Sequence, residues 1–529
     1  MKMDKRFSKK ILVVVTAEPL LEISRLLAAR GHTIEFGTFS GRDHWLKDAP
    51  FISKLHLLGS SAPIDLEEQA YLRMSQWSGS LIKSWRVVFD TKEFLESSWP
   101  DVYTSLSKIM NDPQSRPDFI LSDYLVEAVR DMNFEYDVPI AMHWSQMPTA
   151  MLSAPYIPGA AGLQVDILTS EHATLGQRIY SELVLYCSLP YFLRYRSWVK
   201  AMRASIGVHR LLPTLTKPDY LCLVNSFFGV ETPKDLPPNV VAVGPILADS
   251  YSPLTQLYTS FLAHHTKVIY ISLGTHVLLG HDALCRIFTG LSDSIAFGTI
   301  DGVIWSLRPM AKKQLDTTVS IPYPVQGSSP RLFTIAQLLE NKHPDILFTE
   351  FAPQRALLAH PSTRIFFSHA GAASTNEAVF AGIPVITLGV YFDQIQYSLR
   401  LREAGVSVML LKESLTSEAV SAAISTIAND EGAIRLNCER LKGLATLASR
   451  RKHVAADYIE EVLVDYEWRK QEQELGGRCR PMHLQTADGR MSWWKARNLD
   501  LWAISGIAVL TCLGLFLALP MAIGFEFGN

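Results

Sequence analysis

Apolar positions in the first half of the chain alternate between two spacings. Residues 11–15 form an unbroken apolar run, which is typical of a buried strand. Residues 20–29 then repeat apolar positions with the period of a helix, which Gly31 ends. Residues 33–38 predict the next strand. The order of strand, helix and strand predicts a parallel sheet with helices packed on its faces.

The same alternation returns twice further along the chain. Residues 119–122 and 139–143 predict two more strands, with a helical stretch between them. An aromatic-rich insertion at 164–206 follows, and a second series of strands begins near residue 240. We therefore predict an α/β fold with two doubly wound parallel-sheet domains facing a cleft, where the carboxyl ends of strands place ligands. The second series comprises residues 240–243, 268–273, 302–307, 346–349, 365–368 and 384–388.

The C-terminal end has a different pattern. Residues 501–525 carry no charge, and as a helix they would extend about 37 Å, more than the ~30 Å hydrocarbon core of a bilayer. Basic residues precede this run and only Glu526 follows it, which favours a cytosolic body. We predict a single-pass C-terminal membrane anchor at the endoplasmic reticulum, with a buried core helix as the alternative. The predicted organisation is a first domain at 1–245, a second domain with a closing helix at 246–468, a linker at 469–500 and the transmembrane helix at 501–525.

Composition narrows the functional classes. The chain has 529 residues, 48% of them hydrophobic, which is globular and too long for one compact core. A formal net charge of −2 provides no field that would attract nucleic acid. The six cysteines are scattered without metal-ligand or disulfide-framework spacing. Composition therefore excludes a mainly disordered chain and gives no sign of a nucleic-acid-binding protein.

The block at residues 351–394 carries the candidate chemistry. A predicted strand ends at His369, a run of glycine and alanine follows, and a helix with Ser374 and Glu377 begins there. Small residues let backbone approach a ligand closely, and the positive end of a helix suits a phosphate. His369 and Ser374 can add donors to a diphosphate, and Glu377 can accept hydrogen bonds from a ribose diol. The pattern predicts a nucleotide-diphosphate site.

The same block resembles the donor-binding signature of the UDP-glycosyltransferase family. The matching positions are Phe351-Ala352-Pro353-Gln354, Leu358, His360, residues 366–371, Ser374, Glu377, Gly382-Ile383-Pro384 and Asp393-Gln394. The resemblance implies a GT-B-like fold and an enzyme that transfers a sugar from a UDP-sugar with inversion. The UDP-sugar is the donor substrate, and the resemblance implies no cofactor and no metal. It also implies the following roles: Phe351 stacks on uracil, Gln354 and Glu377 hold the ribose, Thr275, His369 and Ser374 meet the diphosphate, and Asp393 and Gln394 bind the sugar.

The catalytic base departs from the family pattern. Family members carry a histidine just after the first strand, and Thr16 stands at that position here. Three candidates remain open: Asp123, which matches the family's supporting aspartate, Glu18 in the shortened loop, and His143 at the end of another strand. A carboxylate in an apolar cleft can have its pKa raised into a useful range, so Asp123 can act as the base itself.

Two functions follow from these observations. The first is a transferase that moves a sugar, with glucose favoured by Gln394, to a hydroxyl of a lipophilic acceptor such as a sterol, terpenoid or polyketide of secondary metabolism. The anchor and the aromatic insertion favour that acceptor class, and a membrane would be a further partner. The alternative is a non-catalytic membrane partner protein that binds nucleotide sugars.

Overall fold

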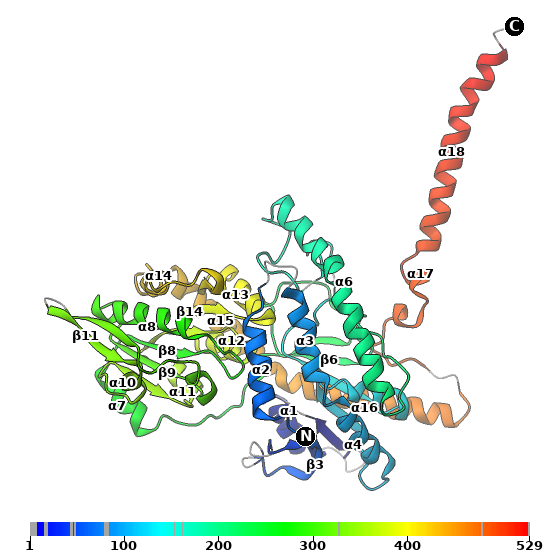
Figure 1. The fold of residues 1–529 in the computed structure, drawn as a ribbon. Helices are drawn as coiled ribbons and strands as arrows, with labels where there is room; N and C mark the ends of the chain where they lie inside the picture. The colour runs from blue at the N-terminus through cyan, green and yellow to red at the C-terminus, as the bar shows by residue number, and fades with distance from the viewer. Residues whose placement is uncertain are drawn as a thin grey trace.

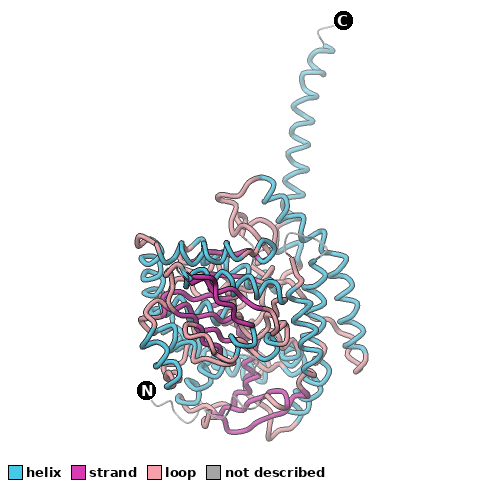
Figure 2. Tube along the Cα trace, turned by 60° about the vertical axis from the view of Figure 1, so that its left-hand side comes forward, coloured by secondary structure: helices cyan, strands magenta, loops and turns pink. Residues whose placement is uncertain are grey.

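The computed structural model describes residues 8–14, 19–42, 46, 49–78, 84–152, 154–160, 162–325, 328–477 and 480–526. Two parallel sheets lie inside the described part of the chain, and helices surround them (Figures 1 and 2). The first sheet has the order β3 (Ile52–Ser60), β2 (Thr33–Ser40), β1 (Lys10–Val14), β4 (Phe119–Asp123), β5 (Ile140–Trp144), β6 (Leu221–Val224) and β7 (Val240–Ala242). The second has the order β12 (Ile346–Thr349), β9 (Gly302–Ser306), β8 (Val268–Ser272), β13 (Thr363–Ser368), β14 (Val385–Gly389) and β15 (Ser407–Leu411).

The central strands of each sheet are buried on both faces, as strands of parallel sheets are, whereas the edge strand β3 is largely exposed. One face of the first sheet packs on α1 (Pro19–Ala29) through Ile11, Val13 and Ile23, among other residues. The prediction of two doubly wound parallel-sheet domains is therefore confirmed. The other helices of the two domains are α2 (Ile64–Ser75), α3 (Trp85–Glu96), α4 (Trp99–Asn111), α5 (Ala128–Tyr136), α6 (Leu175–Ala204), α7 (Gln256–His264), α8 (His281–Ala296), α9 (Pro309–Lys312), α10 (Ile335–Leu339), α11 (Gln354–Ala359), α12 (Ala372–Ala381), α13 (Phe392–Glu403), α14 (Ser417–Ala428) and α15 (Ala433–Ala448).

The chain crosses between the two domains twice. It leaves the first domain through a cis peptide bond at Gly244-Pro245. It returns at α16 (Lys452–Glu474), whose Ala455, Ile459 and Leu463 pack into the core of the first sheet beside α1. The helix that closes the second domain in sequence thus belongs, by its packing, to the first.

Residues 175–204 of the aromatic-rich insertion fold as one long helix, α6. Thr174 and Gln177 form a capping box at its start, which satisfies orphan N–H groups. Its first part projects from the first domain (Figure 1). Apolar side chains three or four residues apart stay exposed along that part: Leu175, Ile179, Leu183, Tyr186, Leu189 and Leu193.

A short hairpin and a separate C-terminal segment complete the architecture. The hairpin joins β10 (Ser320–Val325) and β11 (Ser328–Thr334) beside the second sheet. The C-terminal segment contains α17 (Trp493–Ala496) and α18 (Leu499–Glu526), and α18 extends away from both domains (Figure 1).

The prediction of a transmembrane helix at 501–525 is wrong. None of the helices in the described part of the chain has the length and apolarity needed to cross a membrane. The membrane anchor and the endoplasmic-reticulum location that were derived from this helix are corrected with it.

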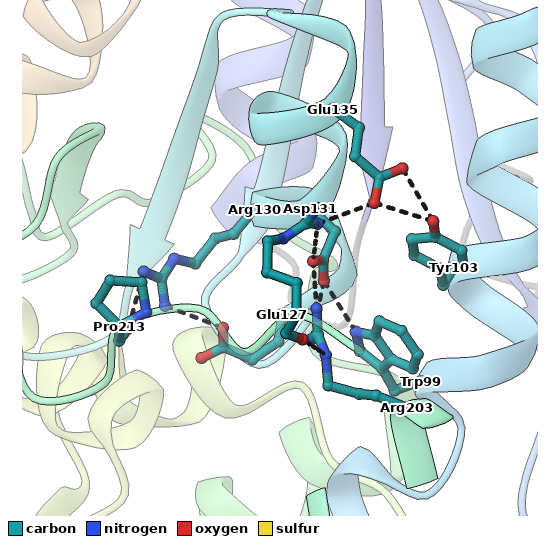
Figure 3. Close-up of polar contacts among 9 residues, drawn as sticks. Trp99, Tyr103, Glu127, Arg130, Asp131, Glu135, Arg203 and Pro213 are labelled. Carbon is teal, nitrogen blue, oxygen red and sulfur yellow. Dashed lines mark hydrogen bonds and ion pairs between the residues drawn. The ribbon is translucent and has the colours of Figure 1, made fainter. Parts of the chain in front are cut away.

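A buried charge network fixes α4, α5 and the base of α6 together (Figure 3). The fully buried Asp131 accepts hydrogen bonds from Arg203 at 2.5 and 3.1 Å, Arg210 at 2.8 Å and Trp99 at 3.2 Å. Arg203 also lies 4.4 Å from the centre of the Trp99 ring. The carboxylate therefore compensates two guanidinium groups inside the first domain.

Replacing this carboxylate should destabilise the first domain. Asp131→Asn leaves the buried Arg203 without its counter-charge, a loss of about 3–5 kcal/mol in the free energy of unfolding. Urea unfolding followed by circular dichroism measures the change. Asp235→Asn, at an exposed position of the same domain, is the matched control. An Asp131→Asn midpoint equal to that of the control would contradict the assignment.

Candidate active site

The loop between β13 and α12 is built to approach a ligand. Ala370 has a φ of 58°, a strained left-handed conformation for a residue other than glycine, and Gly371 caps α12. The first N–H groups of α12 have no intrahelical acceptor, so the helix offers donors and a positive end to an anion. Ser374 lies in this first turn and is buried, while Thr275, in the loop after β8, is exposed.

His369 lies between two glycines at this loop. A Cβ on Gly274 or Gly371 would be 2.5 or 2.4 Å from its Nε2, so only glycine fits at either position. Burial is the main cause that lowers the pKa of His369 to about 4, and the nearby His276 lowers it further. A backbone hydrogen bond at Ser272 acts in the opposite direction. Its Nδ1 is buried without a partner among the described residues. The imidazole is therefore neutral at pH 7.

The predicted ribose residues contact each other. Gln354 Nε2 donates to Glu377 Oε2 at 2.7 Å and to Ser374 Oγ at 3.2 Å. The buried Tyr270 donates its hydroxyl to Gln354 Oε1 at 3.2 Å and so fixes that amide. Phe351, at the start of the same block, is 70% exposed, which leaves a ring face open to a planar base. The structure brings these four predicted residues to one edge of the second sheet.

Asp393 and Gln394 lie in the first turn of α13. Gln394 Oε1 accepts from the backbone N–H groups of Val390 and Tyr391 at 3.1 and 3.2 Å, so its oxygen caps the helix. Burial raises the pKa of Asp393 to about 6. Hydrogen bonds from the backbone N–H groups of Asp393 and Gln394, and the positive charge of Arg400, lower it and so offset part of this effect. Asp393 is therefore available as a carboxylate acceptor at neutral pH.

Asp123 and His143 form a hydrogen-bonded pair in the first domain. They are register partners on β4 and β5, and Asp123 Oδ2 lies 3.1 Å from His143 Nδ1. Asp123 Oδ1 accepts from the N–H of Leu125 at 3.0 Å, so both carboxylate oxygens are engaged. His143 is 1% exposed, and its Nε2 has no partner among the described residues. Glu18, the third candidate, lies outside the described residues.

An aromatic cluster that the sequence did not reveal lies beside Asp393. Trp77 and Trp85, from the first domain, meet Phe392 edge to face with ring centres 6.4 and 6.0 Å apart. Trp77 meets Tyr391 in the same way at 5.9 Å. Both tryptophan Nε1 atoms are buried without a partner in the described part of the chain. The two tryptophans stand eight residues apart, a spacing that matches no motif, so only the fold assembles the cluster.

Buried polar contacts join the two domains at their carboxyl edges. Asn376, next to Glu377 on α12, donates to the carbonyl of Asn225 at 2.9 Å. The Asn225 side chain accepts from the N–H of Ile246 at 2.7 Å, directly after the crossover. The donor half and the His143 half of the site therefore lie against each other, and sequence reasoning missed both asparagines.

Comparisons with known proteins agree with this geometry. A family model described as UDP-glucoronosyl and UDP-glucosyl transferase matches residues 104–444. The chain is 40% identical over 523 residues to UDP-glycosyltransferase FPY2 of Fusarium mangiferae, covering 93% of this chain and 94% of that protein. It is 39% identical over 527 residues to UDP-glycosyltransferase stmC of Aspergillus ustus, covering 98% and 96%.

A solved structure has the same fold. The crystal structure of the glycotransferase of kitacinnamycin superimposes with a TM-score of 0.59 at 17% identity, covering 86% of this chain and 99% of that one. The resemblance carried by residues 351–394 is confirmed. The chain is an enzyme that transfers sugar from a UDP-sugar to a small-molecule acceptor, and it belongs to the UDP-glucuronosyl and UDP-glucosyl transferase family.

Proposed function

We propose that this enzyme transfers glucose from UDP-glucose, with inversion, to a hydroxyl of a lipophilic small molecule such as a sterol, terpenoid or polyketide of secondary metabolism. The observation that carries the mechanism is the Asp123–His143 pair, with its unpartnered Nε2. A buried polar atom without a partner costs about 1–3 kcal/mol, and an acceptor hydroxyl would supply the missing partner.

In this mechanism His143 is the base. Its Nε2 takes the proton of the acceptor hydroxyl, the acceptor oxygen bonds to the anomeric carbon, and the bond from that carbon to the diphosphate breaks. Asp123 holds the Nδ1 side of the ring and stabilises the imidazolium that forms. Both Asp123 oxygens are engaged, which favours an orienting role for this carboxylate over that of a direct base. His143 thus replaces the family histidine that is absent at Thr16.

The second domain would hold the donor. Phe351 stacks on uracil, and Glu377 with Gln354 holds the ribose diol once the diol displaces their mutual contact. The N-terminus of α12 stabilises the charge on the leaving diphosphate, together with Ser374, Thr275 and the neutral His369. Asp393 and Gln394 bind hydroxyls of the sugar. In this proposal the chain's own donors meet the diphosphate, and no resident cofactor or metal takes part.

The acceptor class is inferred from the aromatic side chains around the base. Tyr124 stacks on Trp144 with ring centres 4.2 Å apart, directly after Asp123 and His143. Trp77, Trp85, Tyr391 and Phe392 pack on one another beside Asp393 and make this region of the site apolar. Aromatic faces favour an extended apolar acceptor over a free sugar or a peptide.

Loss of Glu377 should weaken nucleotide binding. Glu377→Ala removes two ribose hydrogen bonds of about 0.5–1.5 kcal/mol each, so the Kd of UDP should rise about tenfold. Isothermal titration calorimetry measures it, with the exposed Glu431→Ala as the control on the same domain. His369→Ala should also raise the Kd of UDP. Unchanged affinity in both variants would contradict the donor site.

Loss of His143 should abolish most of the turnover. General-base catalysis contributes about 10²–10⁴-fold, so kcat of His143→Ala should fall by that much while the Kd of UDP stays unchanged. Asp123→Asn should lower kcat as well. Mass spectrometry of lipophilic acceptors incubated with several UDP-sugars identifies the acceptor for this assay. The exposed His172→Ala is the control, and near-normal turnover of His143→Ala would refute the mechanism.

Donor binding should weaken in acid. The pKa of Asp393 is raised to about 6, so its carboxylate is lost as the pH falls through about 6, and the KM for the UDP-sugar should rise there. Arg400 is the charge that acts on Asp393, and Asp393 in turn raises the pKa of Tyr124, Tyr391 and Tyr397. Asp393→Asn should remove this acid limb from the KM profile. A limb that persists unchanged in Asp393→Asn would assign the titration to another group.

A further inference from the structure

One face of α13 connects the sugar-binding end of that helix to the first domain. Asp393, Tyr397 and Arg400 stand at positions i, i+4 and i+7, so they form one stripe along the helix. Asp393 begins the helix in the donor half of the site. The next two members of the stripe reach across to residues of the first domain.

Tyr397 fixes α13 against the carboxyl end of β5. Its side chain is fully buried, and its hydroxyl donates to the carbonyl of Ser145 at 2.6 Å. Ser145 follows His143 by two residues. The ring packs with Phe227 of the first domain and Leu401 of the second. The position of the hydroxyl is therefore set from both sides, and it sets the spacing between the two domains at this point.

Arg400 makes the second crossing. Its Nη1 lies 2.9 Å from Glu231 Oε1, with 5% of the arginine side chain and none of the glutamate exposed. Its guanidinium lies 5.1 Å from the centre of the Tyr397 ring, so the two contacts form one unit. A buried ion pair contributes little net stability because desolvation offsets the attraction, but it can specify one arrangement. Here the Arg400–Glu231 pair specifies which position along α13 contacts the first domain.

The same arginine acts on the start of the helix. Its positive charge opposes the effect of burial on Asp393 and favours the carboxylate form that can accept sugar hydroxyls. Arg400 thus influences the sugar end of α13 both through the position of the helix and through its charge. Tyr124, beside Asp123 in the first domain, is also within electrostatic reach of Asp393, which places the two ends of the reaction close together.

We propose that Tyr397 and Arg400 are positioning residues for sugar transfer, which hold the sugar-binding end of α13 in register with the carboxyl end of β5 through Ser145 and Glu231. This inference rests on the proposed role of Asp393 in binding the sugar. Nucleotide binding uses α12 and the loops around it, so UDP affinity does not depend on this register. Transfer does, because the acceptor oxygen must reach the anomeric carbon within a fraction of an ångström.

Conservative substitutions test this role without disturbing the fold. Tyr397→Phe removes only the hydroxyl, and Arg400→Lys keeps the charge but loses the planar fork. Each should lower kcat for transfer about three- to tenfold. The ratio of transfer to hydrolysis of the UDP-sugar should fall as well, because a misplaced acceptor lets water compete. The Kd of UDP should stay within about twofold of the wild type.

Matched control variants separate a change in the position of α13 from a general loss of stability. Tyr186→Phe, on the exposed face of α6, and Arg469→Lys, in an ion pair within α16, change the same groups elsewhere. Glu231→Gln should reproduce the Arg400→Lys result. A lowered Tm with unchanged kcat and unchanged transfer-to-hydrolysis ratio in Tyr397→Phe and Arg400→Lys would overturn the proposal, since the contacts would then be purely structural.

The same set of variants distinguishes failure of this positioning role from failure of His143 as the proposed base. If His143→Ala is inactive while Tyr397→Phe and Arg400→Lys transfer normally, the inference is wrong and the proposed function stands. If His143→Ala is active while Tyr397→Phe shows the lowered ratio, the base lies elsewhere and the positioning role is supported.

Discussion

The buried ammonium group of Lys452 holds together the place where the chain leaves one domain and returns to it. Its Nζ lies 2.6 Å from Glu22 in α1, 2.6 Å from Asp249 and 3.0 Å from the carbonyl of Leu247. Glu22 belongs to the first domain, and the other two acceptors follow the crossover. An ammonium has three N–H donors, and all three are used here, which compensates the cost of burying the charge. With this point fixed, α16 lies on α1 and the carboxyl edges of the two sheets meet.

That constraint makes the active site a shared structure. In the proposed mechanism the second domain supplies the nucleotide-binding loops and the first supplies Asp123 and His143, so neither domain would contain the chemistry alone. The pair itself needs no loop. Parallel strands lie about 4.8 Å apart, and two residues in register on neighbouring strands point to the same side of the sheet. Strand register is enough to put an imidazole on a carboxylate.

Local patterns in the sequence revealed the strands and the donor block, and long-range pairing stayed hidden. Buried parallel strands such as 11–15 are apolar runs, and the block at 351–394 is contiguous, so both could be predicted. Asp123 and His143 were each candidates, but their contact depends on the order of strands in the sheet. Tyr397, Arg400 and Glu231 carry no motif, since their partners lie 169 or more residues away. The predicted anchor rested on the uncharged run at 501–525, but none of the described helices has the length and apolarity that a membrane span requires.

The two sides of the nucleotide site differ in how freely they can evolve. Gly274 and Gly371 are each held to glycine by the imidazole of His369, because any Cβ would overlap its Nε2. Phe351 is mostly exposed and makes its contacts to Tyr258 through its backbone carbonyl, so exchanging its ring for another side chain costs little in stability. If Phe351 stacks on the nucleobase as proposed, mutation at this position can tune that recognition in small, tolerated steps. The proposed diphosphate loops have no such graded path, because a side chain at either glycine would displace the His369 ring.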